Sequence, residues 1–241
     1  MVQLYSRRKA LGLGLASVFV PSLSQAAAPP VFVELFTSQG CADCVAADEL
    51  AGQLRNRPGL RLVSLNVDYW DYLGWRDTLG KPQHSQRQQD YAKARGDRDV
   101  YTPQLIINGE NHVVGSNQLA AEAAIRAAQT KPAGVTVSAS VRGNAIEIAV
   151  GPLDGQSGTL WLMGISPEVR VKIERGENNG KTITYHNAVR NLVPAGSWVG
   201  SARTFSIARA AVVTPECSAG VAILQSGHIG RVLGLADITL L

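Results

Sequence analysis

Two cysteines separated by two residues are the pair in this sequence best suited to chemistry. Cys41 and Cys44 follow an apolar stretch and open a segment with helical spacing. Residues i and i+3 lie on one face of a helix, so the two sulfur atoms can reach bonding distance. Free N–H groups and the positive end of the helix dipole stabilise a thiolate on Cys41, which leaves Cys44 as the resolving thiol. Attack by one thiolate and resolution by the other are the two steps of thiol–disulfide exchange.

Cys41 and Cys44 are open to two further interpretations. Either copper or zinc can bind such a pair together with a distant histidine, but the four histidines lie far apart and lack helical metal spacing. We therefore expect no metal and no cofactor. The pair can also form a purely structural disulfide, although a bridge that closes so small a ring removes little entropy from the unfolded chain. Cys217 is predicted to be a small buried apolar residue, with pairing to another chain or a redox partner as the alternative.

The segments around this motif are predicted to alternate strand and helix. An apolar strand over Val31–Phe36 leads into a helix over Cys41–Arg55, and Leu60–Val67 is typical of a buried parallel strand. The remaining predicted elements are a helix near Ser85–Arg95, strands at Gln104–Asn108 and His112–Val114 joined at Asn108 and Gly109, and a helix over Asn117–Ala128 capped by Asn117. The predicted order is β-α-β-α-β-β-α, and the Arg and Lys residues of 87–98 are expected to form a solvated helix face.

The pattern changes after the Lys131–Gly134 stretch. Apolar residues then recur with a period of two, and several short predicted strands, Thr159–Ile165 and Val169–Glu174 among them, fill residues 134–241. Such a series is typical of an antiparallel sandwich. Gly176–Thr182 has three residues between its glycines rather than the four of a phosphate loop, so it is predicted to be a hairpin turn.

Residues 1–28 are predicted to be a signal peptide. Three basic residues, Arg7 to Lys9, precede the apolar run Ala10–Val20, and small residues then allow cleavage after Ala26 or Ala28. General secretion is the expected export route and the twin-arginine route is the alternative. An uncleaved interfacial anchor is the other interpretation of this segment. We expect the mature protein to be periplasmic or secreted.

Composition limits the partners of the mature chain. Without the first 28 residues, 20 basic residues stand against 19 acidic ones. This balance gives no electrostatic reason to expect binding to nucleic acid or to an anionic membrane surface. No other stretch is apolar for long enough to form an integral membrane segment. The expected partners are exported protein substrates or a redox partner.

Several stretches together resemble the thioredoxin superfamily, and more narrowly a family of exported bacterial thioredoxin-like proteins of unknown function. The stretches are Val33–Cys41, Val67–Asp71, Val100–Gln104 and Tyr185–Arg190. The resemblance covers essentially all of residues 31–241. It implies an α/β thioredoxin-like domain at 29–130, followed by the all-β sandwich-like domain at 134–241. It also implies a redox-type site, but it brings no substrate.

The resemblance gives roles to three further residues. Thr102 and Pro103 occupy the place where such proteins carry a cis-proline against the cysteine pair and where the backbone before the proline pairs with an incoming peptide. Glu34 lies seven residues before Cys41, near the place of a buried acid that carries the proton of the buried thiol in thioredoxins. Burial would raise the pKa of such a carboxyl and suit it to acid–base work. The alternative is a Glu34 at the strand end that faces solvent.

Four aromatic residues follow the second predicted strand, and they have two interpretations. Tyr69, Trp70, Tyr72 and Trp75 can line a groove for apolar peptide, or they can anchor a long linker to the domain. Anchoring is the interpretation we favour.

The predicted function is that of an exported thiol–disulfide oxidoreductase that acts on protein disulfides through Cys41 and Cys44. Asp43, between them, places a negative charge beside the thiolate and argues for a moderate redox potential. The alternative is a non-catalytic exported binding protein in which the same cysteines form a structural disulfide or a copper or zinc clamp.

Overall fold

A computed structural model describes residue 1, residues 30–131 and residues 134–240. Apart from residue 1, the predicted signal peptide and its cleavage sites lie outside these described residues. Within the described part of the chain, no helix is long and apolar enough to cross a membrane.

The first half of the chain forms the predicted series of strands and helices. In order they are β1 (Val31–Thr37), α1 (Val45–Leu54), β2 (Leu60–Asn66), α2 (Pro82–Arg95), β3 (Gln104–Ile107), β4 (Asn111–Val114) and α3 (Gln118–Gln129). A short 3-10 helix, η1 (Ala42–Cys44), precedes α1, and another, η2 (Asp71–Leu73), lies between β2 and α2. The side chain of Asn117 accepts a hydrogen bond from Ala120 N, which confirms the predicted cap of α3. The β-α-β-α-β-β-α order is also confirmed.

The second half is made of strands, two of which are much longer than predicted. They are β5 (Val137–Arg142), β6 (Ala145–Val150), β7 (Gly158–Lys172), β8 (Thr182–Trp198), β9 (Arg203–Ala208), β10 (Ala219–Ser226) and β11 (Val232–Thr239), with a 3-10 helix η3 (Arg209–Ala211) after β9. The predicted strands 159–165 and 169–174 are one strand, β7, despite Pro167. β10 pairs with β7 only as far as Ile165, so Pro167 lies where this edge of β7 needs no N–H group.

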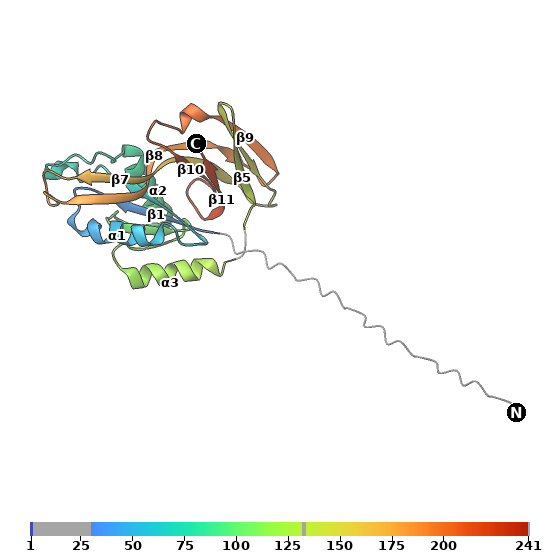
Figure 1. Cartoon of the computed structure of the whole chain (residues 1–241), viewed down its shortest axis with the longest axis horizontal. Helices are drawn as coiled ribbons and strands as arrows, with labels where there is room; N and C mark the ends of the chain where they lie inside the picture. Colours follow the sequence, from blue (N-terminus) through green and yellow to red (C-terminus); the bar gives the residue numbers. More distant parts are fainter. Residues whose placement is uncertain (2–29, 132–133, 241) are drawn as a thin grey trace.

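The predicted fold class is wrong. The described residues contain three α-helices, and most of the regular structure is strand. One mixed eight-stranded sheet, in the order β11-β10-β7-β8-β2-β1-β3-β4, runs through both halves of the chain (Figure 1). The chain therefore does not form a typical α/β thioredoxin-like domain followed by a separate β-sandwich. The physical reason is that the outer edge of β2 is open to pairing, and β8 pairs with it at Ser64. The boundary near residues 131–134 stays a prediction.

The junction between β2 and β8 is short. Ser64 of β2 pairs with Ala188 of β8. Two side chains extend the junction, because Asn187 Nδ2 donates to the carbonyl oxygen of Leu62 at 2.9 Å and the Ser64 hydroxyl donates to the carbonyl oxygen of His186 at 2.9 Å. Asn187 has a φ of 49°, which asparagine adopts more readily than most residues. We call this set of contacts the β2–β8 seam.

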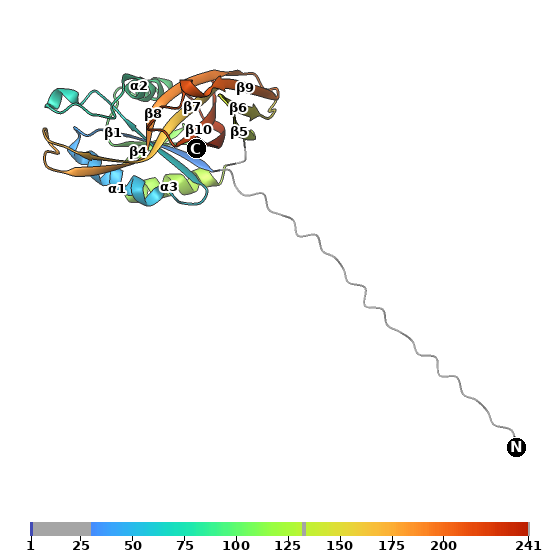
Figure 2. The ribbon, with the colours of Figure 1, turned by 45° about the horizontal axis from the view of Figure 1, so that its top comes forward.

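The sheet is covered on both faces. Alternate residues of a strand face opposite sides, so Val33 and Leu35 of β1 pack against α1 and α3, whereas Phe32 and Phe36 pack against Tyr91 of α2. Figure 2 shows α2 on one side of the strands and α1 with α3 on the other. The small β5-β6-β9 sheet packs over β7, β10 and β11 in the second half.

A buried ion pair lies between β1 and α2. Glu34 is fully buried, and Arg87 Nε donates to its carboxylate at 2.5 Å. The Tyr91 hydroxyl donates to the same carboxylate at 2.5 Å, and Arg87 also donates to Gln225 of β10 at 2.8 Å. The expectation of a solvated face is therefore wrong for Arg87, which is 3% exposed. A polar helix buries its guanidinium here because a carboxylate and an amide oxygen on the sheet accept hydrogen bonds from Nε and Nη2.

Replacing Arg87 tests how much this cluster contributes to the free energy of unfolding. Because Arg87→Leu leaves the Glu34 carboxylate buried without its cation, we expect the free energy of unfolding to fall by about 3–5 kcal/mol. Arg126→Leu, which removes an exposed cation 3.9 Å from Glu122, is the control and should change it by less than about 1 kcal/mol. Urea unfolding followed by circular dichroism measures both, and equal losses in the two variants would contradict the expectation.

Candidate functional site

Cys41 and Cys44 form a disulfide at the point where the chain leaves β1 and begins a helix. Their Cα atoms are 5.4 Å apart. Cys41 precedes η1, and Cys44 is the residue before α1, so the predicted placement at a helix start is confirmed. Cys44 is fully buried and Cys41 is only 5% exposed. Of the pair, Cys41 is the one with access to solvent.

The loop that leads into Cys41 is held by a buried carboxylate. Asp77 accepts hydrogen bonds from the backbone N–H of Gln39 at 2.7 Å and from Asn66 Nδ2 at 3.0 Å. The side chain of Gln39 in turn accepts a bond from Trp75 Nε1 at 2.8 Å. Burial raises the pKa of Asp77, and the hydrogen bonds that it accepts oppose this effect. The segment after β2 therefore sets the position of the cysteine loop.

Thr102 and Pro103 lie beside the cysteine motif. The Thr102–Pro103 peptide bond is cis, as predicted. Both residues line a pocket of about 630 Å³ together with Ala42 and Asp43, the two residues between the cysteines. A polypeptide segment lying in this pocket would contact both the cysteine loop and the proline loop.

The aromatic segment after β2 anchors the loops of the site. Trp70 Nε1 donates to the Thr102 hydroxyl at 2.7 Å, and Tyr69 donates its hydroxyl proton to Gln88 at 3.0 Å. Together with the bond from Trp75, these contacts support the anchoring interpretation. Tyr72 is the exception, because it is 76% exposed.

Glu34 lies away from the cysteine pair. It is buried, which excludes the solvent-facing alternative, but its side chain faces α2. The helix that begins after Cys44 packs on the opposite face of the sheet, as Val33 and Leu35 show. The structure therefore does not bring the carboxylate of Glu34 together with the thiols.

A different buried carboxyl lies on the helical segment that begins at Cys44. Asp48 is four residues further along the same helical segment, so the two residues share a helix face, and its side chain is only 2% exposed. Its Oδ2 accepts a hydrogen bond from the Thr37 hydroxyl at 3.1 Å, and its Oδ1 has no hydrogen-bond partner among the residues that the structure describes. Burial raises the pKa of Asp48 well above the ordinary value, and the nearby charge of Asp77 raises it further.

Asp48 was not among the predicted site residues, although helical spacing marks it as buried. The buried face of α1 carries Ala47, Ala51 and Leu54, and position 48 lies among them. Helical spacing alone predicts that an acidic residue on the apolar face of a helix is buried.

The second half of the chain also contributes to the site. Tyr185 of β8 is buried near Asp48 and Asp77. Burial raises the pKa of its hydroxyl, and the negative charges of the two carboxylates raise it further. At the turn between β7 and β8, Asn178 Nδ2 donates to the carbonyl oxygen of Cys41 at 2.9 Å. No local pattern marks Asn178, because its partner is 137 positions away.

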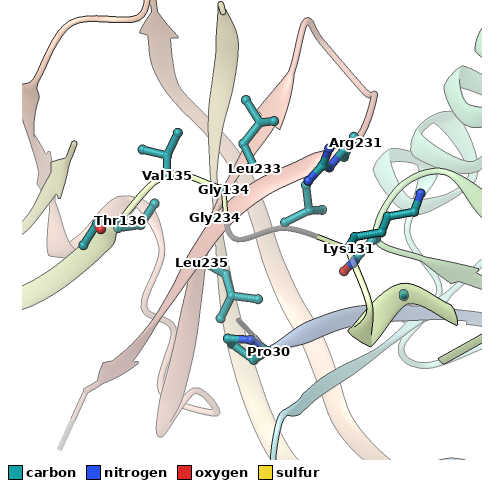
Figure 3. Close-up of a pocket in the computed structure, with 13 residues that line it drawn as sticks. Pro30, Lys131, Gly134, Val135, Thr136, Arg231, Leu233, Gly234 and Leu235 are labelled. Atoms are coloured by element: carbon teal, nitrogen blue, oxygen red, sulfur yellow. The ribbon is translucent and has the colours of Figure 1, made fainter. Parts of the chain in front are cut away.

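The other candidate residues lie outside this site. Cys217 is buried and free, as predicted, and its sulfur is 3.3 Å from the Thr214 hydroxyl. His84 is buried, which lowers its pKa to about 4. In the part of the chain that the structure covers, no group of three or more His, Cys, Asp or Glu side chains is placed to hold a metal ion. A smaller pocket, lined in part by Pro30, Lys131 and Leu235, lies at the start of β1, whereas the disulfide follows its end (Figure 3).

Comparison with known proteins identifies the family. Residues 32–225 match the family model described as "Protein of unknown function (DUF1223)". The chain belongs to this family. A similar fold is found in the crystal structure of protein AGR_C_4864 from Agrobacterium tumefaciens, a structural genomics target that is 30% identical, with a TM-score of 0.77, 88% of this chain covered and 95% of that chain. No curated protein matches the sequence.

The raised pKa of Asp48 predicts how stability depends on pH. Asp48 stays protonated in the folded protein at pH values where the unfolded carboxyl, with a pKa of about 3.9, has ionised. Its contribution is therefore complete below that value and is lost as the pH rises toward the folded-state pKa, by up to about 1.4 kcal/mol per pH unit. We expect Asp48→Asn to gain stability relative to the wild type as the pH rises above about 4.

Urea unfolding at a series of pH values measures this effect. Asp154→Asn, which removes an exposed carboxylate from the loop after β6, is the control. A difference between Asp48→Asn and the wild type that stays constant from about pH 3 to about pH 7 would show that Asp48 does not titrate abnormally.

Proposed function

We propose that this protein is an exported thiol–disulfide oxidoreductase that acts on protein disulfides through Cys41 and Cys44. The observation that carries the proposal is the disulfide at a helix start, whose intervening residues line one pocket with Thr102 and Pro103. The resemblance of these motifs to the thioredoxin superfamily supports the type of reaction. Export through the predicted signal peptide at residues 1–28 is part of the same proposal.

Reduction of a substrate proceeds in two exchange steps. The Cys41 thiolate attacks one sulfur of the substrate disulfide, which forms a mixed disulfide and releases the other substrate sulfur as a thiolate. The Cys44 thiolate then attacks Cys41, which forms the Cys41–Cys44 disulfide and releases the second substrate sulfur. The substrate gains two electrons and the protein loses two, so a dithiol redox partner must reduce the pair again. Oxidation of a substrate is the same sequence in reverse.

We assign the proton transfer of the second step to Asp48. Cys44 is fully buried, so its thiol cannot lose its proton directly to bulk water. Asp48 lies one helical turn away, burial raises its pKa, and its Oδ1 has no hydrogen-bond partner among the described residues. A carboxylate with a raised pKa is a stronger base and can take up the thiol proton, whereas the carboxylate of Glu34 faces α2 on the other side of the sheet.

Thr102 and Pro103 are proposed to position the substrate. The Thr102 hydroxyl accepts a hydrogen bond from Trp70 Nε1, so the side chain of Thr102 is held in place. Thr102 also lines the pocket that Ala42 and Asp43 line. An extended substrate segment would pair with this backbone as an added strand.

The alternative function is that of a non-catalytic binding protein with a structural disulfide. The burial of both cysteines is the observation that favours it. The two functions differ in the reduction potential of the pair.

The reduction potential is the first measurement for the proposed function. Equilibration of the purified protein with glutathione buffers should give a value between about −120 and about −270 mV, the range of working exchange proteins. A value below about −300 mV would identify a structural bridge and would refute the oxidoreductase proposal.

Activity assays of cysteine variants complete this test. Cys41→Ser should abolish the reduction of a disulfide-bonded protein such as insulin, because the attacking sulfur is lost. Cys217→Ala, which removes a buried thiol bonded to Thr214, is the control and should keep the activity.

A second prediction concerns the role of Asp48. The side chain of the Asp48→Asn variant cannot accept a proton, so resolution of the mixed disulfide should slow by about tenfold or more. The remaining increase of this rate with pH should reflect only the ionisation of the Cys44 thiol. Stopped-flow fluorescence across pH measures the rate, with Asp154→Asn, an exposed position in the loop after β6, as the control. An unchanged rate and pH profile in Asp48→Asn would rule out Asp48 as the proton carrier.

A further inference from the structure

We propose that the turn between β7 and β8, residues 173–181, is a cover that restricts access to the Cys41–Cys44 disulfide. We call it the hairpin cover. Access to the disulfide is a property of the protein with or without activity, and only its consequence for substrates rests on the proposed function. The turn corresponds to the glycine-rich stretch predicted to be a hairpin turn, a prediction that the structure confirms.

Asn178 holds the hairpin cover against the cysteine loop. Its side-chain NH2 group donates to the carbonyl oxygens of Gln39 at 3.0 Å and Cys41 at 2.9 Å. Its Oδ1 accepts a bond from Lys181 Nζ at 2.8 Å. Asn178 is fully buried, whereas its neighbours in the turn are exposed. Its side chain is therefore covered by the cysteine loop and not by the rest of the hairpin.

The hairpin cover also rests on the segment after β2. Ile173, at its start, is buried in a cluster that contains Leu79 and Tyr185. Gly176 has a φ of 76°, and a Cβ atom on it would lie 3.4 Å from the Leu73 carbonyl oxygen. The cover therefore contacts the segment after β2 as well as the cysteine loop.

A second contact of the hairpin cover affects reactivity. The Glu177 carboxylate accepts a hydrogen bond from the backbone N–H of Ala42 at 3.3 Å. This N–H is one of the free amides at the helix start that stabilise a thiolate on Cys41. Glu177 occupies this donor and brings a negative charge near Cys41, so the cover disfavours the thiolate while it is in place.

These contacts identify the class of substrate. With the hairpin cover in place, Cys41 is 5% exposed, which leaves little room for in-line attack by a thiol. Displacement of the cover exposes the disulfide and frees the amide of Ala42 together. The productive partners are therefore proteins whose surface displaces residues 173–181, and free low-molecular-weight thiols are poor ones.

The rate of disulfide reduction by dithiothreitol tests the hairpin cover. Dithiothreitol gives two electrons to the Cys41–Cys44 disulfide and itself becomes a cyclic disulfide, and alkylation followed by mass spectrometry counts the thiols formed. Asn178→Ala removes both bonds to the cysteine loop and should accelerate reduction by about tenfold or more. Asn179→Ala, the same substitution at the exposed neighbour, should stay within about twofold of the wild type. Equal rates for Asn178→Ala and the wild type would overturn the proposal.

Two further variants keep the test decisive if Asn178→Ala does not fold. Asn178→Asp has the same shape but places an oxygen atom against two carbonyl oxygens, so it should also accelerate reduction. Glu177→Gln should increase the thiolate fraction of reduced Cys41 at a given pH, read from absorbance near 240 nm, with Glu174→Gln as the matched control. The cover proposal would be overturned if Asn178→Asp were reduced at the wild-type rate and Glu177→Gln had the wild-type thiolate fraction.

The outcomes also separate this proposal from the proposed function. A faster Asn178→Ala reaction in a protein whose potential lies below about −300 mV would support the cover and refute the oxidoreductase. A reduction potential between about −120 and about −270 mV together with an unchanged reduction rate in Asn178→Ala would support the oxidoreductase and refute the cover.

Discussion

The β2–β8 seam is the constraint on which the rest of the structure depends. A single backbone pair, Ser64 with Ala188, and the side-chain bond from Asn187 to β2 make one sheet from two halves of the chain. On the α2 face, the bond from Arg87 to Gln225 ties the same halves together through a buried guanidinium. Because both connections are polar and at least partly buried, breaking either one leaves polar groups without their partners inside the protein.

The candidate site is a consequence of that joint. The first half supplies Cys41, Cys44 and the carboxyl of Asp48. The second half supplies Tyr185, which is buried near that carboxyl, and Asn178, which donates hydrogen bonds to the cysteine loop. The resulting disulfide is buried, and burial raises the pKa of the carboxyl on the helix that follows it. Reactivity at this disulfide is therefore a property of the whole chain.

Features that depend on neighbours within a few positions could be predicted. The spacing of Cys41 and Cys44 at the start of a helix, the cap at Asn117 and the hairpin at Asn108 all follow from local geometry. The fold class could not, because strand order depends on which edges meet, and a period of two does not say which strand is the partner. For the same reason, the prediction of a solvated face failed at Arg87, whose partners lie on two distant strands.

The sequence by itself determined the elements of the first half, the pairing of the two cysteines and the chemistry that they permit, since residues three or four apart meet on any helix. Only the tertiary structure decided that Glu34 is not the acid at the thiols. Helical spacing already puts Asp48 four residues after Cys44, whereas the direction in which β1 turns the carboxylate of Glu34, toward α2, depends on what packs on each face of the sheet. The tertiary structure alone also placed Asn178 over the disulfide, because a contact between residues 137 positions apart is set by the folded chain and by no local pattern.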